Sequence, residues 1–398
     1  MNQQLKVALV STHPPGKGTL NEYGFYLLKH LRQNPNVKEV ILIADELPEG
    51  QHYDFDDEGC PISVQTVWAF NGWTNLWNIL KTVRKTQPDV VLFNIQFLSF
   101  GDSKIPAALG LLSPFFVKKM GYPSVVLLHN ILEQVDLKTA GITQNPVLGY
   151  IFNAIGTMLT KFVLSADMVA VTIAKYVEIL EAKYKTDNVA LIPHGSFEIP
   201  PMPDFDLLPA GPKKVMTFGK FGTYKKVEVM IEAVEIIRKR SSTPLEIVIA
   251  GTDSPNKKGY LEDVKIQYSH VKDLVFTGYV AEEDVPRIFN ESAVVVFPYT
   301  STTGSSGVLH QAGSYGKAVI LPNIGDLGEL IREEGYAGEL FEPDDAESLA
   351  NAIQKVVEDD TYRKTLSIKN YFAAVSLPMA DIVDWYYLHF LRILKNKK

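Results

Sequence analysis

Cysteine is nearly absent from this sequence, and positive charge is not in excess. Cys60 is the single cysteine among 398 residues, which rules out an intramolecular disulfide and a zinc site built from several thiolates. Lysine and arginine number 39 against 46 aspartates and glutamates, for a formal net charge of −7. Because general nucleic-acid binders need surplus cations to displace phosphate counterions, we expect no nucleic-acid partner.

Long apolar runs are also missing. The nearest candidate for a membrane span, residues 145–160, is shorter than the roughly 18 residues required and contains Gly149, Asn153 and Gly156. This segment favours a mostly buried helix. The first residues follow a strand pattern and lack the apolar region of a signal peptide. Together with the single cysteine, these features predict a cytoplasmic protein.

Short apolar runs alternate with helical patterns along most of the chain. At 398 residues, of which 46% are hydrophobic, the sequence has room for two domains with large cores. Runs that are apolar almost throughout are typical of parallel strands buried on both faces. Right-handed crossovers then give a doubly wound, Rossmann-like α/β unit. In the first half the predicted strands are 6–12, 39–45, 63–70, 89–96, 124–130, 168–172 and 189–195.

A proline-rich segment separates this half from a second one. Residues 198–212 contain five prolines and show no helical or strand period, which is typical of a linker. We therefore predict two doubly wound domains, 1–197 and 198–378, with ligands beyond the carboxyl ends of their strands in a central cleft. The predicted strands of the second half are 215–219, 245–251, 274–280, 293–299 and 318–323.

Two loops that follow predicted strands contain residues suited to binding phosphate. In FGKFGTYKK (218–226), Lys220 and Lys225 could hold a diphosphate from two sides, although most lysines are simply solvated. Residues 301–306 are all serine, threonine or glycine and precede a helix predicted to start near Gly307. Such a helix start exposes N–H donors to an anion, and Gln311 lies one turn further on.

Other strand ends offer a glycine loop and two histidines. Gly18 in HPPGKGT (13–19) would allow a ligand to approach the backbone, but an ordinary turn explains it equally well. His129 ends one predicted strand and could bind a sugar hydroxyl or carry a proton, whereas His194 favours a structural role. The acidic runs 282–284 and 358–360 are typical of helix caps and surfaces, so no metal site is predicted.

Five segments in order resemble the retaining glycosyltransferases of the GT-B fold, group 1 or family 4 type. They are ALIPHGSFE (190–198), TFGKFGTYKKVEVMIEA (217–233), LEIVIAGTD (245–253), LVFTGYVAEEDVPRIFNESAVVVFPYT (274–300) and TGSSGVLHQAGSYGKAVIL (303–321). The resemblance implies two Rossmann-like domains facing a cleft, with residues 379–398 forming a helix that packs back on the first domain. That helix would bury one face, which carries Ile382, Trp385, Tyr386, Phe390 and Ile393.

The resemblance also assigns roles to individual residues. Lys220 and Lys225 would bind the donor diphosphate and act in catalysis, and His129 would contact a hydroxyl of the donor sugar. The other residues implied to bind the donor are Gly18, Thr19, Tyr279, Val280, Thr303, Ser306, Gly307, Val308 and Gln311. The sequence departs from the family at Thr303 and Gln311, where the family has a pair of glutamates.

The expected protein is therefore a metal-independent retaining hexosyltransferase without a cofactor, acting in glycan or polysaccharide biosynthesis. Its donor would be a UDP- or GDP-sugar, and its acceptor a sugar, lipid or glycoconjugate. A catalytically silent sugar-nucleotide-binding subunit and a GT-B epimerase are the alternatives. A weak peripheral contact with the inner membrane face, through LLSPFFVKKM (111–120) or the C-terminal helix, also stays open.

Overall fold

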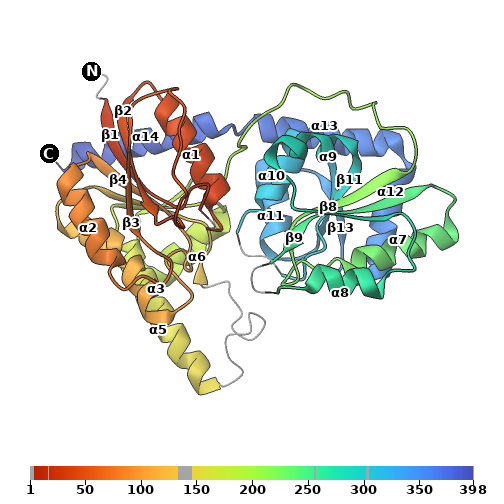
Figure 1. The fold of residues 1–398 in the computed structure, drawn as a ribbon, viewed down its shortest axis with the longest axis horizontal. Coiled ribbons are helices and arrows are strands. Elements are labelled where there is room, and N and C mark those ends of the chain that lie inside the picture. The colour runs from red at the N-terminus through yellow and green to blue at the C-terminus, as the bar shows by residue number, and fades with distance from the viewer. Residues whose placement is uncertain (1–3, 17, 133–145, 255–256, 302–303, 398) are drawn as a thin grey trace. The chain divides into compact units, whose positions relative to one another are not determined.

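The protein is described from a computed structural model, which covers residues 4–16, 18–132, 146–254, 257–301 and 304–397. Two compact units make up the chain (Figure 1). One comprises Met1–His194 with Met379–Lys398, and the other comprises Gly195–Pro378. None of the described helices has the length and hydropathy needed to cross a membrane.

The first unit is built on a seven-stranded sheet of order β3-β2-β1-β4-β5-β6-β7. All neighbouring strands are parallel, and Val7 of β1 pairs with Val40 of β2 and Val90 of β4. The strands are β1 (Leu5–Val10), β2 (Val37–Asp45), β3 (Ile62–Trp68), β4 (Val90–Ile95), β5 (Ser124–Leu128), β6 (Met168–Val171) and β7 (Val189–Leu191). The predicted doubly wound parallel sheet is confirmed for this unit.

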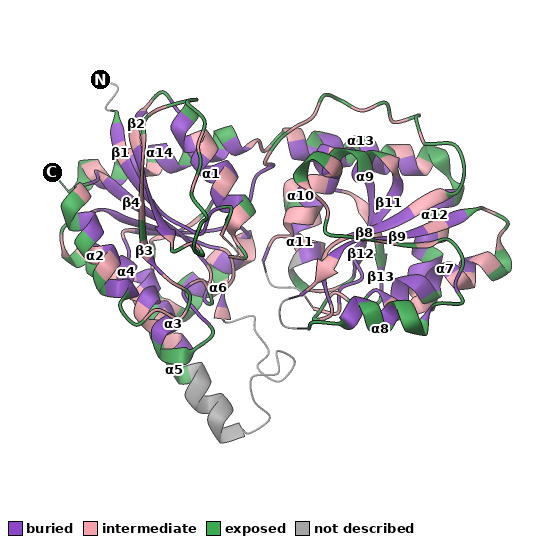
Figure 2. Ribbon diagram, viewed as in Figure 1, coloured by how far each residue is buried: buried purple, intermediate pink, exposed green. Residues whose placement is uncertain are grey.

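Helices cover both faces of this sheet, so the central strands β4 and β5 are buried along their whole length (Figure 2). Helix α1 packs on β2 and on α14, while α2, α4 and α5 pack on β3, β5 and β6. The helices are α1 (Asn21–Gln33), α2 (Asn75–Thr86), α3 (Lys104–Leu111), α4 (Ser113–Lys119), α5 (Pro146–Leu164), α6 (Ala174–Tyr184) and α14 (Met379–Asn396).

Helix α14 belongs to the first unit although it ends the chain. Its buried side chains include Ile382, Tyr386 and Phe390, and Asp384 accepts a hydrogen bond of 2.7 Å from the Asn34 amide. Trp385, which the sequence placed on the same face, is 40% exposed. The prediction was wrong for this residue, because it lies to one side of the stripe that the buried residues Ile382, Tyr386 and Phe390 form along the helix.

The second unit repeats the architecture with six parallel strands in the order β10-β9-β8-β11-β12-β13. Helices α7, α8 and α12 close a core against one face of its sheet, and α13 packs on β12 and α10. Its strands are β8 (Lys213–Phe221), β9 (Leu245–Asp253), β10 (Leu274–Gly278), β11 (Ser292–Val296), β12 (Ala318–Pro322) and β13 (Gly338–Phe341). Its helices are α7 (Glu228–Arg240), α8 (Tyr260–Gln267), α9 (Val285–Glu291), α10 (Gly307–Ser314), α11 (Gly325–Glu334), α12 (Ala346–Glu358) and α13 (Asp360–Val375).

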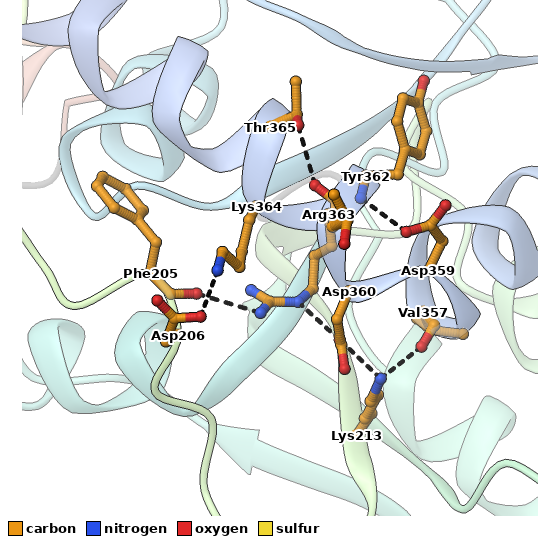
Figure 3. Close-up of polar contacts among 11 residues, drawn as sticks. Phe205, Asp206, Lys213, Val357, Asp359, Asp360, Tyr362, Arg363, Lys364 and Thr365 are labelled. Carbon is orange, nitrogen blue, oxygen red and sulfur yellow. Dashed lines mark hydrogen bonds and ion pairs between the residues drawn. The ribbon is translucent and has the colours of Figure 1, made fainter.

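The proline-rich segment is fastened to α13 of the second unit (Figure 3). The buried Arg363 guanidinium donates to the Phe205 carbonyl at 3.2 Å, and the Lys364 ammonium pairs with Asp206. On the same helix, the Tyr371 hydroxyl donates to the Pro200 carbonyl at 3.1 Å. This segment therefore packs as part of the second unit.

The anchor of the proline-rich segment can be tested by comparing two neighbouring cations on α13. We expect Arg363→Ala to lower the free energy of unfolding of the second unit by about 2–3 kcal/mol, because it removes charged hydrogen bonds in a buried setting. Lys364→Ala should cost less than about 1 kcal/mol, because its ion pair with Asp206 is exposed to water. Urea denaturation measures both, and equal losses would contradict the proposed anchor.

Candidate functional site

The carboxyl ends of β1, β4 and β5 bring together a chain of polar side chains in the first unit. The Ser11 hydroxyl donates to the Thr12 carbonyl at 2.7 Å, and the Asn94 amide nitrogen donates to Ser11 Oγ at 2.9 Å. Asn94 Oδ1 lies 2.6 Å from His129 Nε2. Because the Thr12 carbonyl can only accept, the direction of every bond follows, and His129 Nε2 must carry the proton.

His129 is therefore a neutral histidine whose Nδ1 is an acceptor. Its ring meets the Tyr23 ring edge-on at 4.6 Å between centroids, and the His194 ring lies 6.3 Å away. Burial away from water is the main cause that lowers the pKa of His129 to about 3, and the nearby His194 is a smaller cause. Nδ1 has no hydrogen-bond partner in the described part of the chain, so it can accept a hydrogen bond from a hydroxyl group of a ligand.

Asn94 is the residue of this cluster that the sequence analysis missed. It is 1% exposed, inside the strand VVLFNI, where every other side chain is apolar. A lone amide in a buried strand needs polar partners, and that requirement is the signal that could have identified it. His194, for which a structural role was predicted, is buried, and its carbonyl accepts a hydrogen bond from Tyr23 at 3.1 Å.

The predicted glycine loop of the first unit lies beside this cluster. A side chain at Gly18 would collide with Thr12, since an added Cβ would lie 2.4 Å from Thr12 Cγ2. Packing alone therefore requires glycine here. The exposed Thr19 hydroxyl accepts a hydrogen bond from the Gln96 amide, which links this loop to the loop after β4.

In the second unit, β8 and the loop after it hold the two predicted lysines. Lys225 Nζ lies 4.7 Å from the centroid of the Tyr299 ring and 5.8 Å from that of Tyr224. No carboxylate of the described residues pairs with it, and loss of hydration lowers its pKa. An ammonium group in this position lacks a counter-charge, which favours the binding of an anion.

Lys220 stands near the carboxyl end of β8, opposite Thr252 of β9, and is exposed. It forms no ion pair with any carboxylate that the structure describes. The two lysines are separated by the end of β8 and the loop that starts at Gly222, and Lys225 folds back over Gly219. An added Cβ at Gly219 would lie 2.9 Å from Lys225 Nζ, and its φ of +134° also favours glycine. Two cations therefore share the carboxyl end of β8.

The residues that follow β11 lie close to Lys225. The Thr300 N–H donates to the Tyr224 carbonyl at 2.8 Å, and Lys225 forms an isolated antiparallel β-bridge with Tyr299. The loop after β8 therefore pairs with the segment that leads into α10. Ser306 precedes the helix and does not cap it with its side chain. The N–H groups of Gly307 and Val308 have no acceptor among the described residues, as expected at a helix N-terminus.

Four predicted residues remain to be placed. Tyr279, which is 82% exposed, and Val280 follow β10 and line a recess of about 170 Å³ beside α9. Gln311 is half-buried, one turn into α10. Thr303 lies outside the described residues. The charged groups of the recess include the ion pair of Lys214 with Glu291 at 2.6 Å, so this recess offers less free charge than the end of β8.

No group of three or more potential metal ligands occurs among the residues that the structure describes. The predicted residues thus lie in both units. His129, Gly18 and Thr19 lie at strand ends of the first unit. Those at strand ends of the second unit are Lys220, Lys225, Tyr279, Val280, Ser306, Gly307, Val308 and Gln311.

The neutral state of His129 makes a prediction about pH. Its pKa is about 3 in the folded protein and about 6.5 when unfolded, so the unfolded chain binds more protons between these values. The free energy of unfolding should fall as pH drops below about 6.5, by at most about 1.4 kcal/mol per unit. The stability advantage of the wild type over His129→Gln should shrink over this range in urea titrations. A difference in unfolding free energy between the two proteins that does not change with pH would contradict the neutral state of His129.

Replacing Asn94 by aspartate should make His129 easier to protonate. A carboxylate beside Nε2–H favours the imidazolium and should raise the pKa by roughly 1–3 units. Long-range ¹H–¹⁵N NMR should show the Nε2–H tautomer in the wild type and an earlier transition to imidazolium in Asn94→Asp. Asn351→Asp, on the surface of the second unit, serves as the control. An Nδ1–H tautomer in the wild type would overturn the proposed bond directions.

Comparison with known proteins finds a family match within the second unit. Residues 212–359 match the family model "Glycosyl transferases group 1". An uncharacterized glycosyltransferase of Methanocaldococcus jannaschii is 29% identical over 153 residues, which are 38% of this chain and 37% of that protein. The O-antigen chain mannosyltransferase C of Escherichia coli is 24% identical over 49% of this chain and 52% of its own length. The chain thus spans about half or less of the length of these relatives.

Solved structures match along almost the whole chain. Sucrose-phosphate synthase from Thermosynechococcus elongatus has a TM-score of 0.74 at 19% identity and covers 99% of this chain and 100% of its own. Anabaena HepE, solved in complex with UDP and glucose, has a TM-score of 0.65 at 18% identity, covering 98% and 100%. These likenesses confirm the predicted fold. The chain therefore has the GT-B fold, and its residues 212–359 are similar to the group 1 glycosyl transferases.

Proposed function

We propose that the protein is a glycosyltransferase that moves a sugar from a nucleotide-sugar donor to an acceptor hydroxyl with retention of configuration. The observation that carries this proposal is the Lys225 ammonium, which lies near two tyrosine rings and has no carboxylate partner among the described residues. Through Tyr299 it is paired with the segment that leads into α10. The unpaired N–H groups of Gly307 and Val308 add further donors. A diphosphate has the charge and the acceptor oxygens that this arrangement lacks.

The remaining residues of the second unit fit the other parts of a nucleotide donor. Lys220 would bind the diphosphate together with Lys225. The exposed ring of Tyr279, with the backbone at Val280, would contact the base. The Gln311 amide would bind ribose hydroxyls, with Ser306 and Thr303 nearby in sequence. In the first unit, Gly18 and Thr19 would face the donor.

The proposed sugar transfer needs few groups of the protein. The acceptor oxygen forms a bond to the anomeric carbon on the face from which the diphosphate leaves, and the C–O bond to the diphosphate breaks. The bonding electrons go to the leaving oxygen, which also receives the proton of the acceptor hydroxyl. Lys220, Lys225 and the helix start would stabilise the charge that develops there. Since these groups supply the positive charge, the proposal needs no metal ion and no cofactor.

His129 would bind a hydroxyl of the transferred sugar. Its Nδ1 is an acceptor, so the sugar hydroxyl must donate. A sugar carboxylate in place of this hydroxyl would have no proton to donate to Nδ1. This favours a hexose with a free hydroxymethyl group over a uronic acid.

The similarity to mannosyltransferases of O-antigen synthesis supports a role in glycan or glycoconjugate synthesis. We propose a UDP- or GDP-sugar as the donor and a sugar, lipid or glycoconjugate as the acceptor. We also propose that the enzyme works in the cytoplasm.

Calorimetric titration with UDP, GDP and ADP tests the donor site. We expect one nucleotide to bind, and Lys225→Met to weaken it by about 10- to 100-fold, because a charged hydrogen bond contributes roughly 1.5–3 kcal/mol. Lys220→Met should also weaken binding, but less, since its ammonium is exposed to water. Lys226→Met, an exposed neighbour on the same loop, is the matched control.

Two results would contradict the proposal. If none of the three nucleotides binds, the donor site as described does not exist. If Lys226→Met weakens binding as much as Lys225→Met, general charge attracts the nucleotide and the tyrosine-lined ammonium has no special part. Binding without any sugar transfer in an acceptor screen would favour the silent subunit.

A further inference from the structure

Three buried polar side chains meet between α10 and the end of α11 in the second unit. His310 of α10 is 2% exposed, Tyr336 is 4% exposed, and the side chain of Glu334, the last residue of α11, is 6% exposed. His310 Nδ1 lies 2.9 Å from the Tyr336 hydroxyl and 3.6 Å from Glu334 Oε2. A buried acid and a buried base therefore lie side by side, and the proposed sugar transfer uses neither of them.

Helix α10 packs directly on this group. A side chain at Gly313 would collide with the Tyr336 ring, since an added Cβ would lie 2.6 Å from Tyr336 Cε1. The same Cβ would lie 2.9 Å from the carbonyl oxygen of Asn370 in α13. Because the contacts leave no free space, a charge on His310 or Glu334 stays at a fixed distance from the start of α10.

The start of α10 is also where the proposed donor diphosphate would bind. His310 follows Gly307, the first residue of the helix, by three positions, which is about 4.5 Å along the helix axis. The N–H groups of Gly307 and Val308 favour an anion there. A charge on the pair of His310 and Glu334 would therefore act on the ligand that α10 would bind.

Several features of Glu334 favour a proton on this pair. Glu334 Oε2 is buried and has no hydrogen-bond partner among the described residues. The residue belongs to the last turn of α11, where the helix dipole disfavours a negative charge. Burial, followed by the charge of neighbouring Glu333, raises the pKa of Glu334 to about 8. Whether the acid or the imidazole holds the proton, the pair has no net charge as long as it keeps one.

The groups around the pair do not neutralise a negative charge on it. Of the described residues, no lysine or arginine pairs with Glu334. Helix α13 presents the uncharged Asn370 and Ala374 to α10, and β12 is apolar. The titratable and polar groups on the neighbouring segments are Glu329, Arg332 and Glu333 of α11, Tyr336 and Ser196. Loss of the proton would therefore leave an uncompensated negative charge next to α10.

We propose that His310 and Glu334 share one proton, and that loss of this proton weakens the binding of the donor diphosphate at the start of α10. This role depends on the donor site of the proposed function. Both are positioning residues, since they act on the ligand through α10 and not by contact. A unit negative charge roughly 10 Å from a diphosphate should weaken its binding by about tenfold at an effective dielectric constant near 20.

Calorimetric titration of the full chain with UDP, GDP and ADP between pH 7 and pH 9 tests this role. The phosphates of the ligand are already ionised in this range, so a change in affinity reports on the protein. The affinity of the wild type should fall as the pH rises through about 8, and the fall should be about tenfold smaller in Glu334→Gln. Lys225, whose pKa is lowered, can lose its own proton here, but it does so in both proteins and cancels in the comparison.

Two further variants separate this role from a structural one. Glu334→Met, which also lacks a titratable group, should behave like Glu334→Gln. Glu333→Gln is the matched control, because its carboxyl is exposed, and it should keep the fall in affinity. If Glu334 only supported the fold, its variants would change the affinity by the same factor at every pH.

Urea titrations test the shared proton without a nucleotide. The folded protein binds more protons than the unfolded chain between about pH 4.5 and pH 8, because the pKa of Glu334 rises on folding. The wild type should therefore lose stability relative to Glu334→Gln as the pH rises across this range.

Three outcomes would overturn the proposal. If nucleotide affinity has the same pH profile in the wild type and Glu334→Gln, the shared proton has no part in binding, while the donor site stands. If the stability difference between these two proteins does not change between pH 4.5 and pH 8, the pair does not hold the proton. If none of the nucleotides binds any of the proteins, the donor site itself fails, and the role of the pair fails with it.

Discussion

Burial of both faces of a parallel sheet is the constraint on which both units depend. Helices cover the strands above and below, so a polar side chain inside a strand must find a partner within the protein or lie at a strand end. In a parallel sheet all strands end at the same edge, where the chain continues toward the next helix. His129 and Lys220 therefore lie at strand ends, although they come from different units. Asn94 is the polar residue inside a buried strand, and its amide is satisfied by hydrogen bonds with Ser11 and His129.

The polar groups around His129 and those around Lys225 differ in their electrostatics. In the first unit, loss of hydration keeps His129 neutral, and a chain of hydrogen bonds ending at a backbone carbonyl determines which nitrogen carries the proton. In the second unit, the Lys225 ammonium is surrounded by the π-faces of Tyr224 and Tyr299, which accommodate a cation without neutralising it. The first cluster suits an uncharged hydroxyl, and the second suits an anion. A nucleotide sugar contains both kinds of group.

The proline-rich segment shows that composition does not decide packing. Its composition is typical of a linker, but Arg363 and Tyr371 bind its carbonyls, and it packs on α13. The contacts of the segment decide how it packs, and its composition does not report them.

The sequence by itself determined the alternation of strands and helices, the parallel sheets and most residues at the strand ends. These follow from short-range patterns, since apolar runs report burial and small residues report turns. It did not yield β13, α11 or α13, whose patterns are short or mixed. Only the tertiary structure decided that Asn94 holds His129 and that Trp385 faces solvent. Each depends on contacts between residues far apart in the chain, and periodicity within one element carries no information about them.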